Sequence, residues 1–165
     1  MHHSEKELVH KATIAEVYRD KGSGQHFLSA SKTFKIGEVV CNFNSSSESD
    51  TPTYLTVQIS NDKHITLYPE YLQYINHSCV PNVFFDTEKM ELICIRDIQP
   101  GDEITFFYPS TEWEMAQPFL CQCGNPECLQ IIQGAAFLPE NLMNRHRVTR
   151  FIENKMSEKS NVEIG

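Results

Sequence analysis

Short stretches of hydrophobic residues are separated by polar turns along most of the chain, a pattern that is typical of β-strands. Residues 54–59 alternate between hydrophobic and polar and predict a hairpin with residues 64–68, while β-branched and aromatic residues predict two strands within residues 22–43. Further apolar stretches predict strands at 83–86, 91–98 and 103–108. Residues 5–19 fit a short helix and a strand equally well. The serine-rich residues 45–52 predict a polar, mobile loop.

Only the end of the chain carries a clear helical pattern. After Pro139, apolar residues recur at the spacing of one helix face. They are Leu142, Val148, Phe151, Ile152 and Met156. We expect one amphipathic helix here, covering one side of the domain. Because no strand–helix–strand alternation and no internal repeat precede it, the pattern predicts a single, mainly β domain.

Composition limits the partners and the compartment. The chain has 165 residues, 40% of them hydrophobic, which suffices for one core. A net charge of −8 disfavours direct nucleic-acid binding and favours a basic protein or peptide, although acidic charge can also serve solubility alone. No stretch is apolar enough to span a membrane, and the N-terminus lacks the apolar segment of a secretory signal. We therefore expect an intracellular protein, cytoplasmic or nuclear.

Three cysteines lie within eight residues, Cys121, Cys123 and Cys128, with a Gly-Asn-Pro turn between the second and the third. Such spacing in a chain without an export signal indicates a metal site rather than disulfides. A closed structural zinc site needs four ligands, so one must come from elsewhere. The alternative is three free thiols in a surface loop.

The candidates for the fourth ligand are the three remaining cysteines, Cys41, Cys79 and Cys94. Cys94 lies in the middle of an expected strand, and Cys41 also fits the core. Cys79 ends the irregular run Asn-His-Ser-Cys and is our choice. His77 and Cys79 could instead form a base–nucleophile pair, but neighbouring positions seldom bring the two side chains together, and a metal-bound thiolate is no free nucleophile.

Three segments together resemble the SET-domain protein methyltransferases. They are YINHSCVPNV (74–83), IRDIQPGDEITFFY (95–108) and FLCQCGNPECLQIIQGAAFL (119–138). The resemblance covers residues 20–137 and implies a SET-domain β-fold of several small curved sheets with a pseudoknot. It divides the chain into a SET domain (5–120), a post-SET zinc-binding segment (121–137) and a C-terminal helix and tail (138–165).

The chain departs from the family pattern in three ways. After Gly22 and Gly24 the expected aromatic residue comes one place late, at Phe27. Phe107 replaces an aspartate that often precedes the tyrosine of the family's strand motif, and no cysteine cluster precedes the domain.

The resemblance implies an S-adenosylmethionine-dependent protein-lysine N-methyltransferase that acts on a lysine-bearing protein or peptide, such as a histone tail. Tyr108 would be the catalytic residue, and Phe106 would line the lysine channel with it. The implied cofactor-binding residues are Gly22, Gly24, Tyr74, Asn76, His77, Tyr108, Trp113 and Phe119. The implied zinc ligands are Cys79, Cys121, Cys123 and Cys128.

Some of these positions have plainer interpretations. Phe106 lies at the family's Phe/Tyr switch and favours di- or trimethylation, but it could instead be an ordinary core aromatic. Tyr74 and Trp113 could likewise serve packing alone. Glu112, Glu114 and the serine-rich loop could face a basic substrate. The alternative function is a catalytically inactive, zinc-stabilised SET-like module that binds a peptide or protein.

Overall fold

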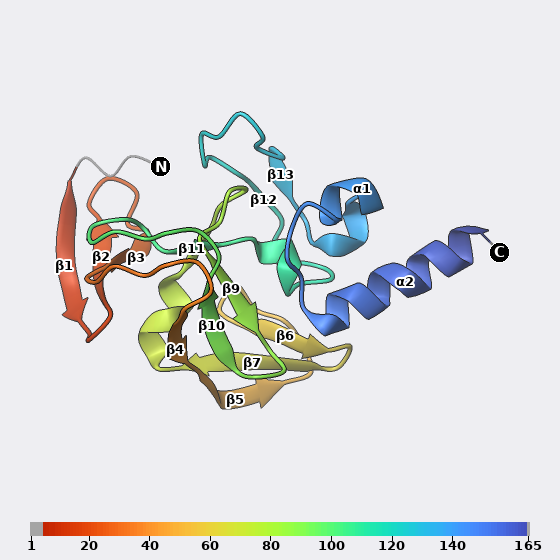
Figure 1. The fold of residues 1–165 in the computed structure, drawn as a ribbon, viewed down its shortest axis with the longest axis horizontal. Coiled ribbons are helices and arrows are strands. Elements are labelled where there is room, and N and C mark those ends of the chain that lie inside the picture. Colours follow the sequence, from red (N-terminus) through yellow and green to blue (C-terminus); the bar gives the residue numbers. More distant parts are fainter. Residues whose placement is uncertain (1–4, 165) are drawn as a thin grey trace.

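The computed structural model of the protein describes residues 5–164, and in these residues the chain forms five small β-sheets with a few short helices. The N-terminal sheet and the C-terminal helices lie at opposite ends of the long axis, with the other sheets between them (Figure 1). The prediction of a mainly β domain is confirmed. None of the helices in residues 5–164 combines the length and hydropathy needed to cross a bilayer.

The first sheet resolves the ambiguity at the N-terminus in favour of strands. β1 (Lys6–Lys11), β2 (Ala15–Asp20) and β3 (His26–Ala30) pair antiparallel in that order. In β2 the buried Ala15 and Val17 alternate with half-exposed residues, which is the two-residue period of a strand. β1 is exposed along its whole length, so its side chains carry no periodic signal.

The prediction of a mobile loop at 45–52 is wrong. Most of this stretch forms β5 (Asn44–Ser49), which pairs antiparallel with β7 (Lys63–Tyr68). Five of its six side chains are exposed, so burial does not hold the strand in place. It is held by backbone hydrogen bonds and by two serine hydroxyls that each lie 2.6 Å from the Thr66 hydroxyl. β5 is therefore an edge strand whose polar composition resembles that of a loop.

The predicted hairpins are confirmed, although one strand of each is shorter than expected. β6 (Val57–Ser60) pairs with β7, although the strand begins three residues later than expected. β10 (Glu91–Cys94) pairs with β9 (Val83–Asp86) on one side and with β4 (Val39–Asn42) on the other.

The remaining strands are two residues long and pair across long stretches of sequence. β8 (Asn76–His77) pairs in parallel with β11 (Thr105–Phe106), which is all that forms of the six-residue strand expected there. β12 (Phe119–Leu120) pairs antiparallel with β13 (Ile131–Ile132). The 3-10 helix η1 (Glu70–Tyr74) leads directly into β8.

The predicted C-terminal helix is confirmed, but it begins later than expected, and the first part of the pattern forms a separate short helix. α1 (Glu140–Met143) is short, and α2 (Arg150–Ile164) begins after a break. Thr149 explains the break: its backbone N–H donates to the Ser110 carbonyl at 3.0 Å, and its hydroxyl accepts the Ile152 N–H at 3.3 Å. The first turn of α2 is thereby fixed against the β domain.

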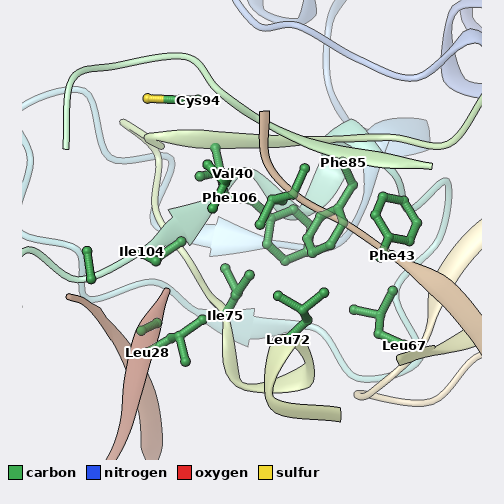
Figure 2. Close-up of a cluster of buried hydrophobic side chains, with 14 of the residues drawn as sticks. Leu28, Val40, Phe43, Leu67, Leu72, Ile75, Phe85, Cys94, Ile104 and Phe106 are labelled. Atoms are coloured by element: carbon green, nitrogen blue, oxygen red, sulfur yellow. The ribbon is translucent and has the colours of Figure 1, made fainter. Parts of the chain in front are cut away.

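Two hydrophobic clusters stabilise this arrangement. The larger one draws on most of the sheets, and Figure 2 shows Leu28, Leu72, Ile75, Phe85 and Phe106 converging in it. The smaller one joins the C-terminal segment to the domain. Its buried members are Phe107, Ala135, Met143 and Ile152. Phe106 and Phe107 therefore face different clusters, and together they fix the backbone that leads into Tyr108.

Candidate active site and metal centre

The site is built where β8 and β11 lie side by side. Around this two-residue pairing, the Ser78 N–H donates to the Phe106 carbonyl at 3.0 Å and the Asn82 N–H donates to the Thr105 carbonyl at 3.2 Å. The Asn82 side chain adds two bonds: it accepts the Thr105 N–H at 2.9 Å and donates to the Glu103 carbonyl at 2.9 Å. Here the resemblance places its pseudoknot, and two segments about 30 residues apart are held together by a side-chain amide as well as by the backbone.

His77 links this crossing to both the tyrosine and the cysteines. Its Nδ1 accepts the Tyr108 backbone N–H at 3.1 Å, so in the neutral ring the proton is on Nε2, which lies 3.3 Å from the Cys79 sulfur. Burial, together with the nearby His146, lowers the pKa of His77 to about 3. The imidazole is therefore neutral and orients its neighbours.

Tyr108 begins the 3-10 helix η2 (Tyr108–Ser110), and its hydroxyl donates to the Ile75 carbonyl at 3.2 Å. Burial raises the pKa of Tyr108 strongly, and the carboxylates of Glu112 and Glu103 raise it further. The phenol thus stays protonated at physiological pH. It can donate and accept hydrogen bonds, but it cannot serve as an anionic base.

A cavity of about 620 Å³ opens beside Tyr108. Five of the residues expected at the site line it, namely Tyr74, Asn76, Phe106, Tyr108 and Phe119. The Tyr108 ring centre lies 4.6 Å from that of Phe106 and 5.8 Å from that of Phe119. An aromatic wall with a few polar groups in a cavity of this size is typical of small-molecule and cofactor sites.

The two glycines border this cavity without lining it. Gly22 and Gly24 form the turn between β2 and β3, where the Gly22 N–H donates to the Asp20 carboxylate at 2.8 Å and Gly24 has φ +78°. A left-handed φ is one that glycine adopts without strain. Directly after this turn, Gln25 lines the cavity and donates to the Asn76 side-chain oxygen at 3.2 Å. The glycine turn therefore reaches the site through Gln25.

Two other expected cofactor-binding residues lie elsewhere. His77 lines a separate cavity of about 350 Å³, together with Cys123 and Asn125. Trp113 is half-buried and packs against the smaller hydrophobic cluster, with the Lys155 ammonium 5.3 Å from its ring centre. The structure gives Trp113 the packing environment that was its plainer interpretation.

Glu112 is a site residue whose position the sequence did not reveal. It lines the large cavity and is only 6% exposed, whereas we expected it on the surface with Glu114, which is exposed. Its Oε2 accepts the Gln58 N–H at 3.0 Å and the Thr111 hydroxyl at 2.6 Å, and its Oε1 has no hydrogen-bond partner among the described residues. Burial raises the pKa of Glu112 to about 7. In the sequence, a glutamate four residues past the end of the strand expected at 103–108 carries no sign of burial.

The cysteine cluster forms as expected. The sulfur atoms of Cys79, Cys121, Cys123 and Cys128 all lie within 4.8 Å of one another, and those of Cys79 and Cys121 are 3.9 Å apart. Zn–S bonds of about 2.3 Å in a tetrahedron separate the sulfurs by about 3.8 Å, so the cluster fits zinc. Cys94 is fully buried in the larger hydrophobic cluster and Cys41 packs against it, so neither is in the group.

Comparisons with known proteins agree with this geometry. The family model "SET domain" matches residues 25–109. Methyltransferase flvH of Aspergillus flavus is 39% identical over 109 residues, which are 65% of this chain and 61% of that protein. An H3 lysine-36-specific histone-lysine N-methyltransferase of Candida albicans is 34% identical over 107 residues, covering 56% of this chain and 13% of that protein.

Among solved structures, KRYPTONITE in complex with mCHG DNA and SAH matches 74% of this chain and 30% of its own, with a TM-score of 0.57 and 21% identity, which supports the fold alone. The chain spans less than two thirds of the length of these proteins. The family model nevertheless covers about half of the chain and includes two of the three motifs. The resemblance drawn from the sequence is thus confirmed, and the protein belongs to the SET-domain family.

Proposed function

We propose that the protein is an S-adenosylmethionine-dependent N-methyltransferase that acts on lysine side chains of a basic protein, such as a histone tail. The observation that carries the proposal is the placement of Tyr108. The hydroxyl of this half-buried residue is anchored 3.2 Å from a backbone carbonyl, in a cavity that Asn76 and Phe119 also line.

The cofactor would supply a methyl group on a sulfonium, open to in-line displacement. Residues on the β3 side of the cavity fit its amino-acid end: Gln25 and Asn76 hold each other by a hydrogen bond, and Tyr74 stacks on His26 with ring centres 4.8 Å apart. A fixed wall of this kind would orient the bound molecule before reaction.

The lysine amine must be neutral to react, and at pH 7 its neutral form costs roughly 4–5 kcal/mol in water. A cavity walled by Phe106 and Tyr108 would reduce this cost by disfavouring the ammonium. The Tyr108 oxygen, which already donates to Ile75, keeps lone pairs that can accept an N–H bond from the amine. Glu112, with its pKa near 7, would accept the proton that the ammonium gives up.

The cysteine cluster would hold zinc in a structural role. Zinc on Cys79, Cys121, Cys123 and Cys128 would fix residues 121–128 against the crossing and so keep β12 with Phe119 over the cavity. The 3.9 Å separation of the Cys79 and Cys121 sulfurs supports this assignment. The division into a SET domain (5–120), a post-SET segment (121–137) and a tail (138–165) follows from the same assignment.

Charge and relatives support the substrate class. A net charge of −8 suits a basic protein better than nucleic acid. Several relatives carry names specific for histone H3 lysine 36, which favours a histone tail. Phe106 lacks a hydroxyl that would restrict the space near the amine, so we propose di- or trimethylated products.

The test is incubation of the full, zinc-loaded chain with labelled S-adenosylmethionine and a panel of histones, read by mass spectrometry. Tyr108→Phe should lower turnover at least about 100-fold, because the amine loses its orienting oxygen. Tyr68→Phe, at an exposed tyrosine outside the cavity, is the matched control. If the chain does not bind S-adenosylmethionine in calorimetry, the inactive peptide-binding module becomes the better account.

A further inference from the structure

A second cavity, of about 270 Å³, shares no lining residue with the large one. Arg96, Arg145 and Arg147 all line it. The chain has only five arginines and a net charge of −8, and three of the five line this one cavity. Such a concentration calls for an explanation of its own.

The positive charge of this cavity is only partly compensated. Arg147 is oriented, with its guanidinium 4.5 Å from the centre of the Phe84 ring and 3.9 Å from the Asp86 carboxylate. Arg96 and Arg145 form no ion pair with any residue in the described range 5–164. Glu127 is the single carboxylate among the described residues that line the cavity. Two guanidinium groups thus remain unpaired around a small volume.

Two neutral polar groups beside the arginines also lack partners. Ser110, 2% exposed, lines the cavity, and its hydroxyl is buried without a hydrogen-bond partner among the described residues. His146 stacks on Phe107 with ring centres 3.7 Å apart, and its ring nitrogens form no hydrogen bond with a described residue. A buried hydroxyl without a partner is uncommon and often marks the place of a bound ion or water.

We propose that this cavity binds a phosphoryl group, either as inorganic phosphate or as a phosphate monoester on a small carrier. Three guanidinium groups from two segments line the cavity, and several N–H donors around one volume suit a tetrahedral oxyanion with several acceptor oxygens. The Ser110 hydroxyl and the His146 ring add donors that are uncharged. The cavity is larger than a bare phosphate, which leaves room for the carrier.

The cysteine cluster offers a competing explanation for the arginines, because a zinc ion with four thiolates carries a net charge of −2. Only Cys79 of the four ligands lines the cavity, however. The experiment below separates the two explanations by measuring zinc content together with phosphate binding.

The test is calorimetric titration of the full, zinc-loaded chain with inorganic phosphate and, separately, with O-phosphoserine, at constant ionic strength. We expect saturable binding with a Kd of about 1 mM or below. The double variant Arg96→Ala/Arg145→Ala should weaken it at least about tenfold, since it removes two charge-assisted contacts. The matched control is Arg19→Ala, at an exposed arginine of β2 that pairs with Glu7 and lies outside the cavity.

Tighter binding of O-phosphoserine than of phosphate would support the proposal and identify the monoester as the ligand, and the reverse order would identify free phosphate. Three results would overturn the proposal. The first is phosphate binding that does not saturate up to about 20 mM phosphate. The second is an Arg19→Ala variant whose phosphate binding is weakened as much as that of the double variant, and the third is a double variant that loses zinc while its phosphate binding is unchanged. Both alanine sites are exposed, so the variant should fold. The outcome does not depend on methyltransferase activity.

Discussion

Glu112 makes the stability of this protein depend on pH in a predictable direction. Burial raises its pKa from the ordinary value of 4.5 to about 7, so the folded state binds this proton more tightly than the unfolded state does. The resulting stabilisation is fully present below pH 4.5 and is lost as the pH rises through 7. The shift corresponds to about 3 kcal/mol in total, of which about 2 kcal/mol fall between pH 5.5 and 8.5.

The perturbation that isolates this effect is Glu112→Gln. The amide oxygen can still accept the Gln58 N–H and the Thr111 hydroxyl, while the ionisation is removed. Relative to the wild type, the variant should therefore gain about 2 kcal/mol of unfolding free energy on going from pH 5.5 to pH 8.5. Other titrating groups are common to both proteins and cancel in this difference.

The assay is urea denaturation of both proteins at the two pH values, with zinc present throughout. Glu114→Gln is the matched control, because Glu114 is exposed and should show a change below about 0.5 kcal/mol. A wild-type–variant difference that is the same at both pH values would refute the reasoning, because Glu112 would then ionise as freely in the folded state as in the unfolded one.

Three further changes test other parts of the structure. Cys128→Ser should release zinc and lower the melting temperature, as measured by metal analysis and calorimetry, whereas Cys41→Ser, outside the cluster, should retain the metal; equal retention would exclude this ligand set. Phe106→Tyr should shift the product towards monomethyl-lysine in mass spectra, and an unchanged product distribution would remove Phe106 from the channel. Gly134→Ala should destabilise the fold by about 2–4 kcal/mol in urea titrations. The reason is that Gly134 has φ +113° and the new Cβ would lie 2.4 Å from the Trp113 carbonyl oxygen. A loss of unfolding free energy below about 0.5 kcal/mol would show that the backbone at Gly134 moves away from the backbone at Trp113 easily.

The sequence was most informative where chemistry depends on a rare combination of residues. The cluster of Cys121, Cys123 and Cys128 left few choices for a fourth sulfur, and the structure selects Cys79, as expected. The motif that ends in Tyr108 likewise led to the correct family.

The sequence was least informative where position depends on partners far along the chain. β5 is a strand because β7 lies beside it, and its exposed serines give no periodic pattern. Glu112 and Trp113 are neighbours in sequence, yet one lines the cavity and the other packs towards α2. Both residues are held by Gln58. Its backbone N–H donates to the Glu112 carboxylate, and its side-chain oxygen accepts the Trp113 backbone N–H at 2.9 Å. Local sequence patterns do not report such long-range contacts.

The crossing of β8 and β11 also affects which part of the structure unfolds first. The His77–Tyr108 contact closes a separation of 31 residues and the Cys79–Cys121 contact one of 42, whereas the neighbouring hairpins close over a few residues. Closing such long loops costs more conformational entropy than closing a hairpin, and strands of only two residues offer few hydrogen bonds to offset this cost. We therefore expect the crossing to open locally at a lower free energy than the hairpins do. Amide protons around the crossing should therefore exchange with solvent before those of β9 and β10. In that case gentle warming would abolish the geometry at Tyr108 while most of the sheet structure was still intact.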